Sequence, residues 1–323
     1  MDQMIVKKKK NAAGIVSSAL VKVLMYIFLI SMSFVLIYPI IYMLAMAFRP
    51  LAELKDPTTL WLTQTPTLEN IKTMWDHMKL STVLPQSVFI SVVSALLSTV
   101  ICAITGYGFA RFKFKEKGFW IGVLFATIVV PQAVLTIASY LQMKDFPVLG
   151  IVPLIEMITG QSIEINLLDT VWVYFLPAVF GRGLSSGIFI LVFYQFFRGL
   201  PVELENSAYV DGAGPIRTFF YIAFPNMKPP TVVTFLLSMV WYWNDTDISG
   251  TYCIQLQTIS KRLLSVYTDM TQLLGMANGH GVYHEEVPLI QAALLIAVVP
   301  MLLLFLLCQR SFVKSVATAG IVG

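Results

Sequence analysis

A compact polar stretch lies between two long apolar stretches of this 323-residue chain and reads PVELENSAYVDGAGPIRTFFYIAFPNMKP, residues 201–229. Pro201 ends the preceding helix and can begin a new one, because proline is tolerated in a first turn. Glu203 and Glu205 would then lie in that first turn, where negative charge is favourable to the helix dipole. We expect a short helix that continues to Val210, with Glu, Asn and Asp side chains on its exposed face.

The residues that follow predict where this helix ends. Gly212 or Gly214 can take the positive φ that closes a helix at its C-terminus. A second helix is expected near Pro215, and the run FPNMKPP, residues 224–230, bends the chain into the next apolar stretch. An ordinary solvated loop does not need prolines and glycines in this order. The pattern therefore predicts a rigid surface helix.

Other residues that could do chemistry are few. His280 and His284 stand four apart in HGVYHEE and could bind a metal ion if they were helical. The glycine between them, and the lack of a third nearby Cys or His, favour a solvated loop, so we predict no metal site. The sequence has no G-x-x-x-x-G-K-[ST] phosphate loop, so this chain is not expected to bind ATP itself. Arg182 is the one charged candidate at membrane depth.

The elements that must hold these residues are strongly apolar. Hydrophobic residues make up 57% of the chain and charged residues only 12%, against about 25% charged residues in soluble domains. Several blocks reach the roughly 20 apolar residues that cross a bilayer core. We predict an all-α membrane protein, since the strands of a transmembrane barrel would alternate polar and apolar residues. Six spans are expected, at Val23–Phe48, Ser87–Ala110, Phe119–Met143, Ser185–Phe197 extended upstream by Val171–Phe180, Pro230–Trp243 preceded by Phe219–Phe224, and Val287–Cys308.

Lysine and arginine predict the orientation of these spans. Four lysines at residues 7–10 precede the first span, and ARFKFKEK, residues 110–117, follows the second. Acidic residues gather after the first and third spans, on the opposite side. We therefore expect a cytoplasmic N-terminal tail over residues 1–22, a membrane domain over 23–310 and a cytoplasmic C-terminal tail over 311–323. The apolar run after the lysines is too long for a signal peptide.

The polar stretch resembles the EAA loop of ABC-importer permeases, whose pattern is E-A-A-x(3)-G-x(9)-I-x-L-P. Asn206 replaces the acidic residue of that pattern and Ser207 replaces an alanine, while Glu205 could supply the charge one position early. The run Asp211-Gly212-Ala213 is similar to the variant of the loop found in sugar importers. The matching positions are Asn206, Ser207 and Ala208, then Gly212, Ile222, Phe224 and Pro225.

Further segments are similar to permeases of the maltose-type sugar importers, in particular the partner without extra N-terminal helices. They are YGFARFKFKEK at 107–117, VVPQAV at 129–134 with a Pro-Gln break, WYWND at 241–245 and QRSFVKSVATAG at 309–320. The resemblance covers most of residues 20 to 320. It fails at about Ile151–Asn166, which looks like an outer insertion.

This resemblance implies a permease without catalytic chemistry or a cofactor of its own, in a bacterial cell membrane. It implies a second homologous permease, an external binding protein that delivers a sugar, and two cytoplasmic ATPase subunits that bind ATP and each grip one EAA loop; no nucleic acid is involved. A permease for peptides or amino acids is the first alternative, and a secondary transporter or a membrane scaffold is the second. The residues implied in ATPase coupling are Glu203, Glu205, Asn206, Ser207, Ala208, Asp211, Gly212, Ala213 and Pro225.

Two further regions are candidates for contact with the cargo or with the binding protein. The resemblance implies that the polar outer segment Thr246–Glu286 reaches into the binding protein, although a plain exposed loop is the alternative. Trp241, Trp243 and Asn244 could line a sugar path, because aromatic rings stack on sugar C–H faces and an amide bonds hydroxyls. The two tryptophans could instead be anchors at the bilayer interface. They cannot both face one side of a helix.

Overall fold

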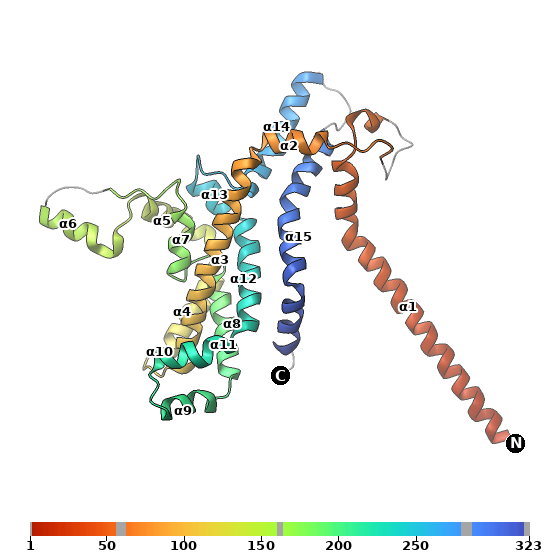
Figure 1. Ribbon diagram of the computed structural model, residues 1–323, viewed down its shortest axis with the longest axis horizontal. Helices are drawn as coiled ribbons and strands as arrows, with labels where there is room; N and C mark the ends of the chain where they lie inside the picture. Colours follow the sequence, from red (N-terminus) through yellow and green to blue (C-terminus); the bar gives the residue numbers. More distant parts are fainter. Residues whose placement is uncertain (1, 56–62, 160–163, 279–285, 320–323) are drawn as a thin grey trace. The chain divides into compact units, whose positions relative to one another are not determined.

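The computed structural model describes residues 2–55, 63–159, 164–278 and 286–319, and the chain is helical over most of its length (Figure 1). No strand occurs among the described residues, which confirms the all-α prediction. The chain divides into two units. The first unit is residues 1–74 with 270–295, and the second unit is residues 75–269 with 296–323.

In the first unit, α1 (Asp2–Ala47) leads into a short 3₁₀ turn, η1 (Leu51–Lys55). The part of α1 from Leu20 to Ala47 is long and apolar enough to cross a membrane. The predicted tail boundary at residue 22 falls inside this helix. The amide of Asn70, in α2 (Glu69–His77), donates to the carbonyl oxygens of Ala47 at 3.1 Å and Arg49 at 2.7 Å. These bonds tie the start of α2 to the end of α1.

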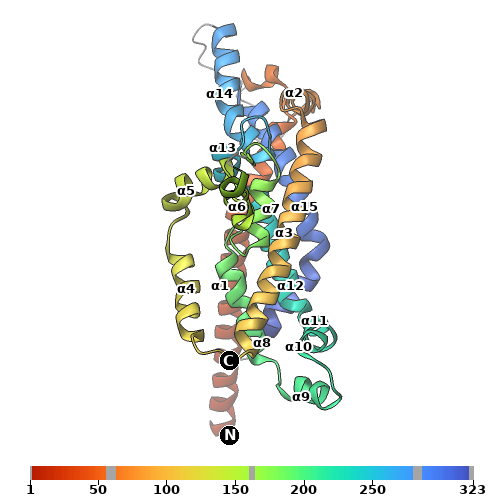
Figure 2. The ribbon, with the colours of Figure 1, turned by 90° about the vertical axis from the view of Figure 1, so that its left-hand side faces the viewer.

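The second unit is built around α3 (Leu80–Arg111), which contacts α7 (Trp172–Val179), α8 (Ser186–Gly199) and α12 (Lys228–Trp243) (Figures 1 and 2). Small side chains let such helices approach closely. A Cβ on Gly106 would lie 2.6 Å from the Cβ of Phe193 and 2.9 Å from the backbone nitrogen of Tyr194, so only glycine fits there. The buried small residues of α3 include Ser91, Ser94, Ala95, Ser98, Cys102 and Ala103.

The predicted third span, Phe119–Met143, is broken into α4 (Lys117–Val129) and α5 (Gln132–Lys144), whose axes differ by 99°. The break falls at Val130 and Pro131, where the Pro-Gln break is expected. Proline has no N–H and also disfavours a helical conformation in the residue before it. Before the break, α4 contacts α8, and after it, α5 contacts α13 (Asp247–Tyr252).

Among the described residues, three helical stretches are long and apolar enough to span a membrane alone: Leu20–Ala47, α3, and Glu286–Arg310 within α15 (Glu286–Ala319). Two bent pairs meet the same criterion together, α4 with α5, and α8 with α9 (Glu203–Val210). The predicted fourth span is interrupted between α7 and α8. The predicted fifth span is the 16-residue α12, about 24 Å long at 1.5 Å per residue. The count of six spans therefore stays a prediction.

The segment before α12 winds irregularly through α10 (Pro215–Thr218), the π-helical turn η3 (Phe219–Ala223) and α11 (Phe224–Asn226). In the outer segment Thr246–Glu286, α13 and α14 (Ile259–Asn278) occupy most of the length, so the alternative of a plain loop does not hold for these residues. Its contact with a binding protein stays a prediction.

The predicted insertion at 151–166 contains α6 (Ile151–Thr159), which follows the 3₁₀ turn η2 (Val148–Gly150). His280 and His284 lie outside the described residues, so the predicted absence of a metal site there stays a prediction.

Candidate coupling helix and its anchor

The helix predicted from the polar stretch is present as α9, at the end of the second unit opposite α13 (Figures 1 and 2). The chain bends by 74° between α8 and α9. The carbonyl oxygen of Val202 accepts the amide hydrogens of Glu205 at 3.0 Å and Asn206 at 2.9 Å. Glu203 and Glu205 lie in the first turn, as predicted.

The C-terminal end of α9 also follows the prediction. Gly212 has φ +80°, whereas Gly214 has φ −76°. The amide of Gly212 donates to the Tyr209 carbonyl at 3.0 Å, and the amide of Ala213 donates to the Ala208 carbonyl at 2.9 Å. This pair of bonds is the Schellman motif, which satisfies the last carbonyls of a helix through a residue with positive φ. After it, α10 begins at Pro215.

Glu205 is not on the exposed face of α9, so that expectation is wrong. Its side chain is buried and points to the end of α3, where one carboxylate oxygen accepts a hydrogen bond from Arg111 Nε at 2.8 Å. The Tyr107 hydroxyl donates to the other oxygen at 3.4 Å. Arg111 also donates from Nη2 to the carbonyl oxygen of Leu200 at 2.7 Å. Glu205 therefore fastens α9 to α3 and does not present its charge outward.

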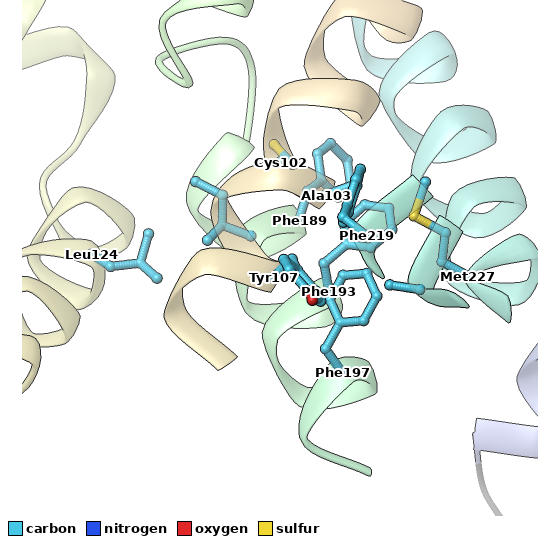
Figure 3. Packing of buried hydrophobic residues seen from close by; sticks show 11 residues of the cluster. Cys102, Ala103, Tyr107, Leu124, Phe189, Phe193, Phe197, Phe219 and Met227 are labelled. Carbon is cyan, nitrogen blue, oxygen red and sulfur yellow. The ribbon is translucent and has the colours of Figure 1, made fainter. Parts of the chain in front are cut away.

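The contact of Glu205 with Arg111 and Tyr107 is called the anchor of α9 here. Through Tyr107 it continues into an aromatic cluster (Figure 3). The ring of Tyr107 lies 5.2 Å from the ring of Phe197 in α8 and 4.9 Å from that of Phe219 in η3. Tilted and edge-to-face arrangements at such distances stabilise aromatic pairs. The cluster therefore connects the anchor of α9 to three elements, α3, α8 and η3.

The other predicted coupling residues remain near the surface. Ala208 and Ala213 are half-buried, and the rest are exposed: Glu203, Asn206, Ser207, Asp211, Gly212 and Pro225. Sequence reasoning missed large apolar side chains beside them. Val210 is 87% exposed, Ile216 76% and Tyr221 72%. Large exposed apolar side chains are typical of a contact with another protein or with the membrane, and their presence within a polar stretch is the signal that could have revealed them.

The predicted sugar-path residues are not brought together around one space. Trp243 is buried, and its Nε1 donates to the carbonyl oxygen of Ala297 in α15 at 3.1 Å. The ring of Trp241 lies 5.2 Å from that of Phe189 in α8. The exposed Asn244 side chain donates to the carbonyl oxygen of Val240 at 3.0 Å. The two tryptophans thus contact different helices, in agreement with the argument that they face different sides.

Residues 103–318, which include the anchor, α9 and the irregular segment after it, match the family model of the binding-protein-dependent transport system inner membrane component. The chain belongs to this family. It is therefore a membrane component of a transport system, and its family is not one of enzymes. A family of binding-protein-dependent systems implies a solute-binding protein and ATPase subunits as partners of this permease.

Named relatives support the same assignment, and a solved structure has the same fold. The arabinooligosaccharides transport system permease protein AraQ of Halalkalibacterium halodurans is 25% identical over 301 residues, which are 90% of this chain and 93% of the relative. The diacetylchitobiose uptake system permease protein DasC of Streptomyces coelicolor is 24% identical over 290 residues, 89% and 92% of the two chains. A chain from the crystal structure of a bacterial ABC transporter for the acidic polysaccharide alginate has a TM-score of 0.70 at 16% identity. That match covers 92% of this chain and 98% of the other, and it shows a shared fold.

Proposed function

We propose that this permease and a second homologous permease form the membrane pathway of an ATP-driven importer for a sugar or oligosaccharide. An external binding protein would deliver the saccharide, and two cytoplasmic ATPase subunits would bind the ATP. The single observation that carries the proposal is α9, a short helix with a fixed base and an exposed apolar end. The names of the relatives and the Asp211-Gly212-Ala213 run support a saccharide over a peptide or an amino acid.

The geometry of the anchor suggests how ATPase movement would reach the pathway. A displacement of α9 acts through Glu205 on Arg111, at the end of α3. Because α3 contacts α7, α8 and α12, that displacement would be distributed over most of the second unit. Alternating access requires such a stiff connection between a moving contact and packed helices. In this mechanism the chain itself makes and breaks no covalent bond.

The proposed location is a bacterial cell membrane, with both termini and α9 on the cytoplasmic side. The lysines at 7–10 and the basic run at 110–117 support this orientation by the positive-inside rule. The apolar faces of the spans would contact lipid.

The proposal is tested by purification of the permease, produced together with its second permease and its ATPase. Val210→Asp should lower the amount of ATPase recovered with the permease at least about tenfold, because a charge at the centre of an apolar contact is a hot-spot change. Ile254→Asp is the matched control, since Ile254 is 84% exposed and is predicted to lie on the opposite side of the membrane. Equal ATPase recovery with both variants, at equal membrane abundance, would contradict the proposed contact.

A further inference from the structure

The second unit contains a groove of about 970 Å³ formed by α4, α5, α7, α13 and the start of α8. One wall is formed by α4 and α5, which meet at the 99° bend at Pro131; the course of these two helices can be followed in Figure 2. The opposite wall is the turn between α7 and α8. In that turn a Cβ on Gly183 would lie 2.3 Å from the Tyr242 hydroxyl, which accepts the Leu184 amide hydrogen at 3.2 Å. The turn is therefore packed directly onto α12.

The residues that border the groove include aromatic, hydroxyl and amide side chains, which are the groups that bind saccharides. The ring of Tyr252 borders it and is stacked with the ring of Tyr140 at 6.3 Å, with 27° between the planes. An aromatic face of this kind packs against sugar C–H groups. Hydroxyl and amide groups border the same space and can bond sugar hydroxyls; they belong to Thr136, Ser139, Thr251, Gln132 and Gln142.

Arg182 brings a positive charge into this groove. Its backbone amide donates to the carbonyl oxygen of Pro177 at 2.7 Å, and its Nη1 donates to Oε1 of Gln142 at 3.3 Å. In the described part of the chain, no carboxylate forms an ion pair with Arg182. A guanidinium has five N–H donors, so one bond to a neutral amide leaves donors for a ligand.

A charged side chain within a membrane domain is costly, and such residues concentrate on substrate and ion pathways. The planar guanidinium binds carboxylates through two parallel hydrogen bonds, which a neutral hydroxyl cannot match in strength. Asp247 also borders the groove. Its carboxylate can accept hydrogen bonds from sugar hydroxyls, but it would repel a second negative charge.

We propose that the groove is a saccharide-binding site of this permease, and that Arg182 selects an acidic sugar by pairing with its carboxylate. The site takes a saccharide with one carboxylate near Arg182 and with hydroxyls toward Asp247. The inference rests on the proposed function, because it concerns the cargo of the same importer. Trp241, Trp243 and Asn244 are not among the residues that border this groove.

The test uses two disaccharides that differ only at one carbon, cellobiose and its uronate cellobiuronic acid. Their binding is measured on the purified complex of permeases and ATPases in lipid nanodiscs. A non-hydrolysable ATP analogue is present and the binding protein is absent, so bound sugar reports on the membrane subunits. The unmodified complex is expected to bind cellobiuronic acid more tightly than cellobiose. Arg182→Gln should weaken the binding of cellobiuronic acid at least about tenfold, equivalent to about 1.4 kcal/mol. The binding of cellobiose should change less than about twofold.

Arg198→Gln is the matched control, because the Arg198 guanidinium lies 5.6 Å from the centre of the Tyr194 ring and does not border the groove. Arg182→Lys should keep part of the preference for the uronate, because lysine retains the positive charge but lacks the planar guanidinium that bonds a carboxylate at two points. Equal losses for both sugars in Arg182→Gln would overturn the inference, and so would an unmodified complex that binds cellobiose as tightly as the uronate or binds neither sugar. ATPase recovery with the permease is a separate readout, and its loss in the unmodified complex would instead contradict the proposed function.

Discussion

At the residue scale, the pair of Glu205 and Arg111 decides how α9 is held. Both side chains are largely buried, with 3% of Glu205 and 10% of Arg111 exposed. Removing one partner of a buried ion pair costs about 3–5 kcal/mol, because the other charge is left without compensation. We therefore expect the loss of either partner to disturb the position of α9 more than a change of the exposed Asn206, although Asn206 occupies the position of the acidic residue in the EAA pattern.

We predict that Glu205→Ala and Arg111→Ala each reduce sugar uptake and lower the thermal stability of the purified permease. The double variant should be destabilised by less than the sum of the two single effects, with a coupling energy of about 1–3 kcal/mol between the two sites. The measurements are melting temperature in detergent and ATP-driven uptake, both at matched membrane abundance. Glu203→Ala is the control, since this exposed acid in the same turn should change stability by less than about 0.5 kcal/mol. Simple addition of the two single effects would show that the pair does not act as an anchor.

Sequence reasoning could place Glu205 in a helical turn but could not place its partner. The position in the first turn follows from Pro201, because proline favours the start of a helix. Arg111, in contrast, lies 94 residues earlier in the chain. The same limit applies to Trp243, whose acceptor Ala297 is 54 residues away. Contacts between distant segments depend on how the helices pack, and a single sequence does not contain that information.

At the element scale, α9 ends in a turn that contains Gly212 and Gly214. Only Gly212 has the positive φ that favours glycine, at +80°. A β-branched residue at positive φ is strongly disfavoured, and the cost is about 1–2 kcal/mol. A Cβ on Gly212 or on Gly214 would have no neighbour within 4 Å. A difference between substitutions at these positions therefore reports backbone conformation and not a steric clash.

We predict that Gly212→Val uncouples ATP hydrolysis from uptake, because it disturbs the turn that sets the direction of the chain after α9. Gly214→Val is the matched control, since Gly214 has φ −76°, and its uptake should stay near the unmodified level. Gly212→Asn should be intermediate, because asparagine tolerates positive φ better than valine. The ratio of transported sugar to hydrolysed ATP in proteoliposomes provides the measurement. Equal ratios of transported sugar to hydrolysed ATP in the two valine variants would contradict the prediction.

The elements themselves were predictable to different degrees. The turn at Gly212, the start at Pro215 and the break at Pro131 depend on glycine and proline, whose backbone preferences are local. The helix α14 was not predicted, because the outer segment was considered only as a polar segment that reaches the binding protein or forms a plain loop. Its buried residues Ile259 and Val266 are seven positions apart, which is the spacing of one face of an amphipathic helix. That periodicity was a readable signal.

At the scale of the whole molecule, the number of spans depends on α12 and on the two bent pairs, α4 with α5 and α8 with α9. The 16 residues of α12 extend about 24 Å, which is short for a hydrocarbon core of about 30 Å. The irregular segment from α10 to α11 precedes it and could supply the missing length. An even number of spans puts both termini on one side, as the distribution of lysine and arginine predicts. A crossing by α12 would separate α9 from α13 by the membrane.

We predict that cysteines introduced at Glu203 and at Ile254 react from opposite sides of the membrane. Both positions are exposed, while the native Cys102 and Cys253 are buried and Cys308 is removed by Cys308→Ser. In intact cells, a membrane-impermeant maleimide should label Ile254→Cys. Glu203→Cys, and Gln309→Cys near the C-terminal end, should be labelled only after the membrane is permeabilised. Labelling of Ile254→Cys that also requires permeabilisation would mean that α12 does not cross, and the six-span topology would be wrong.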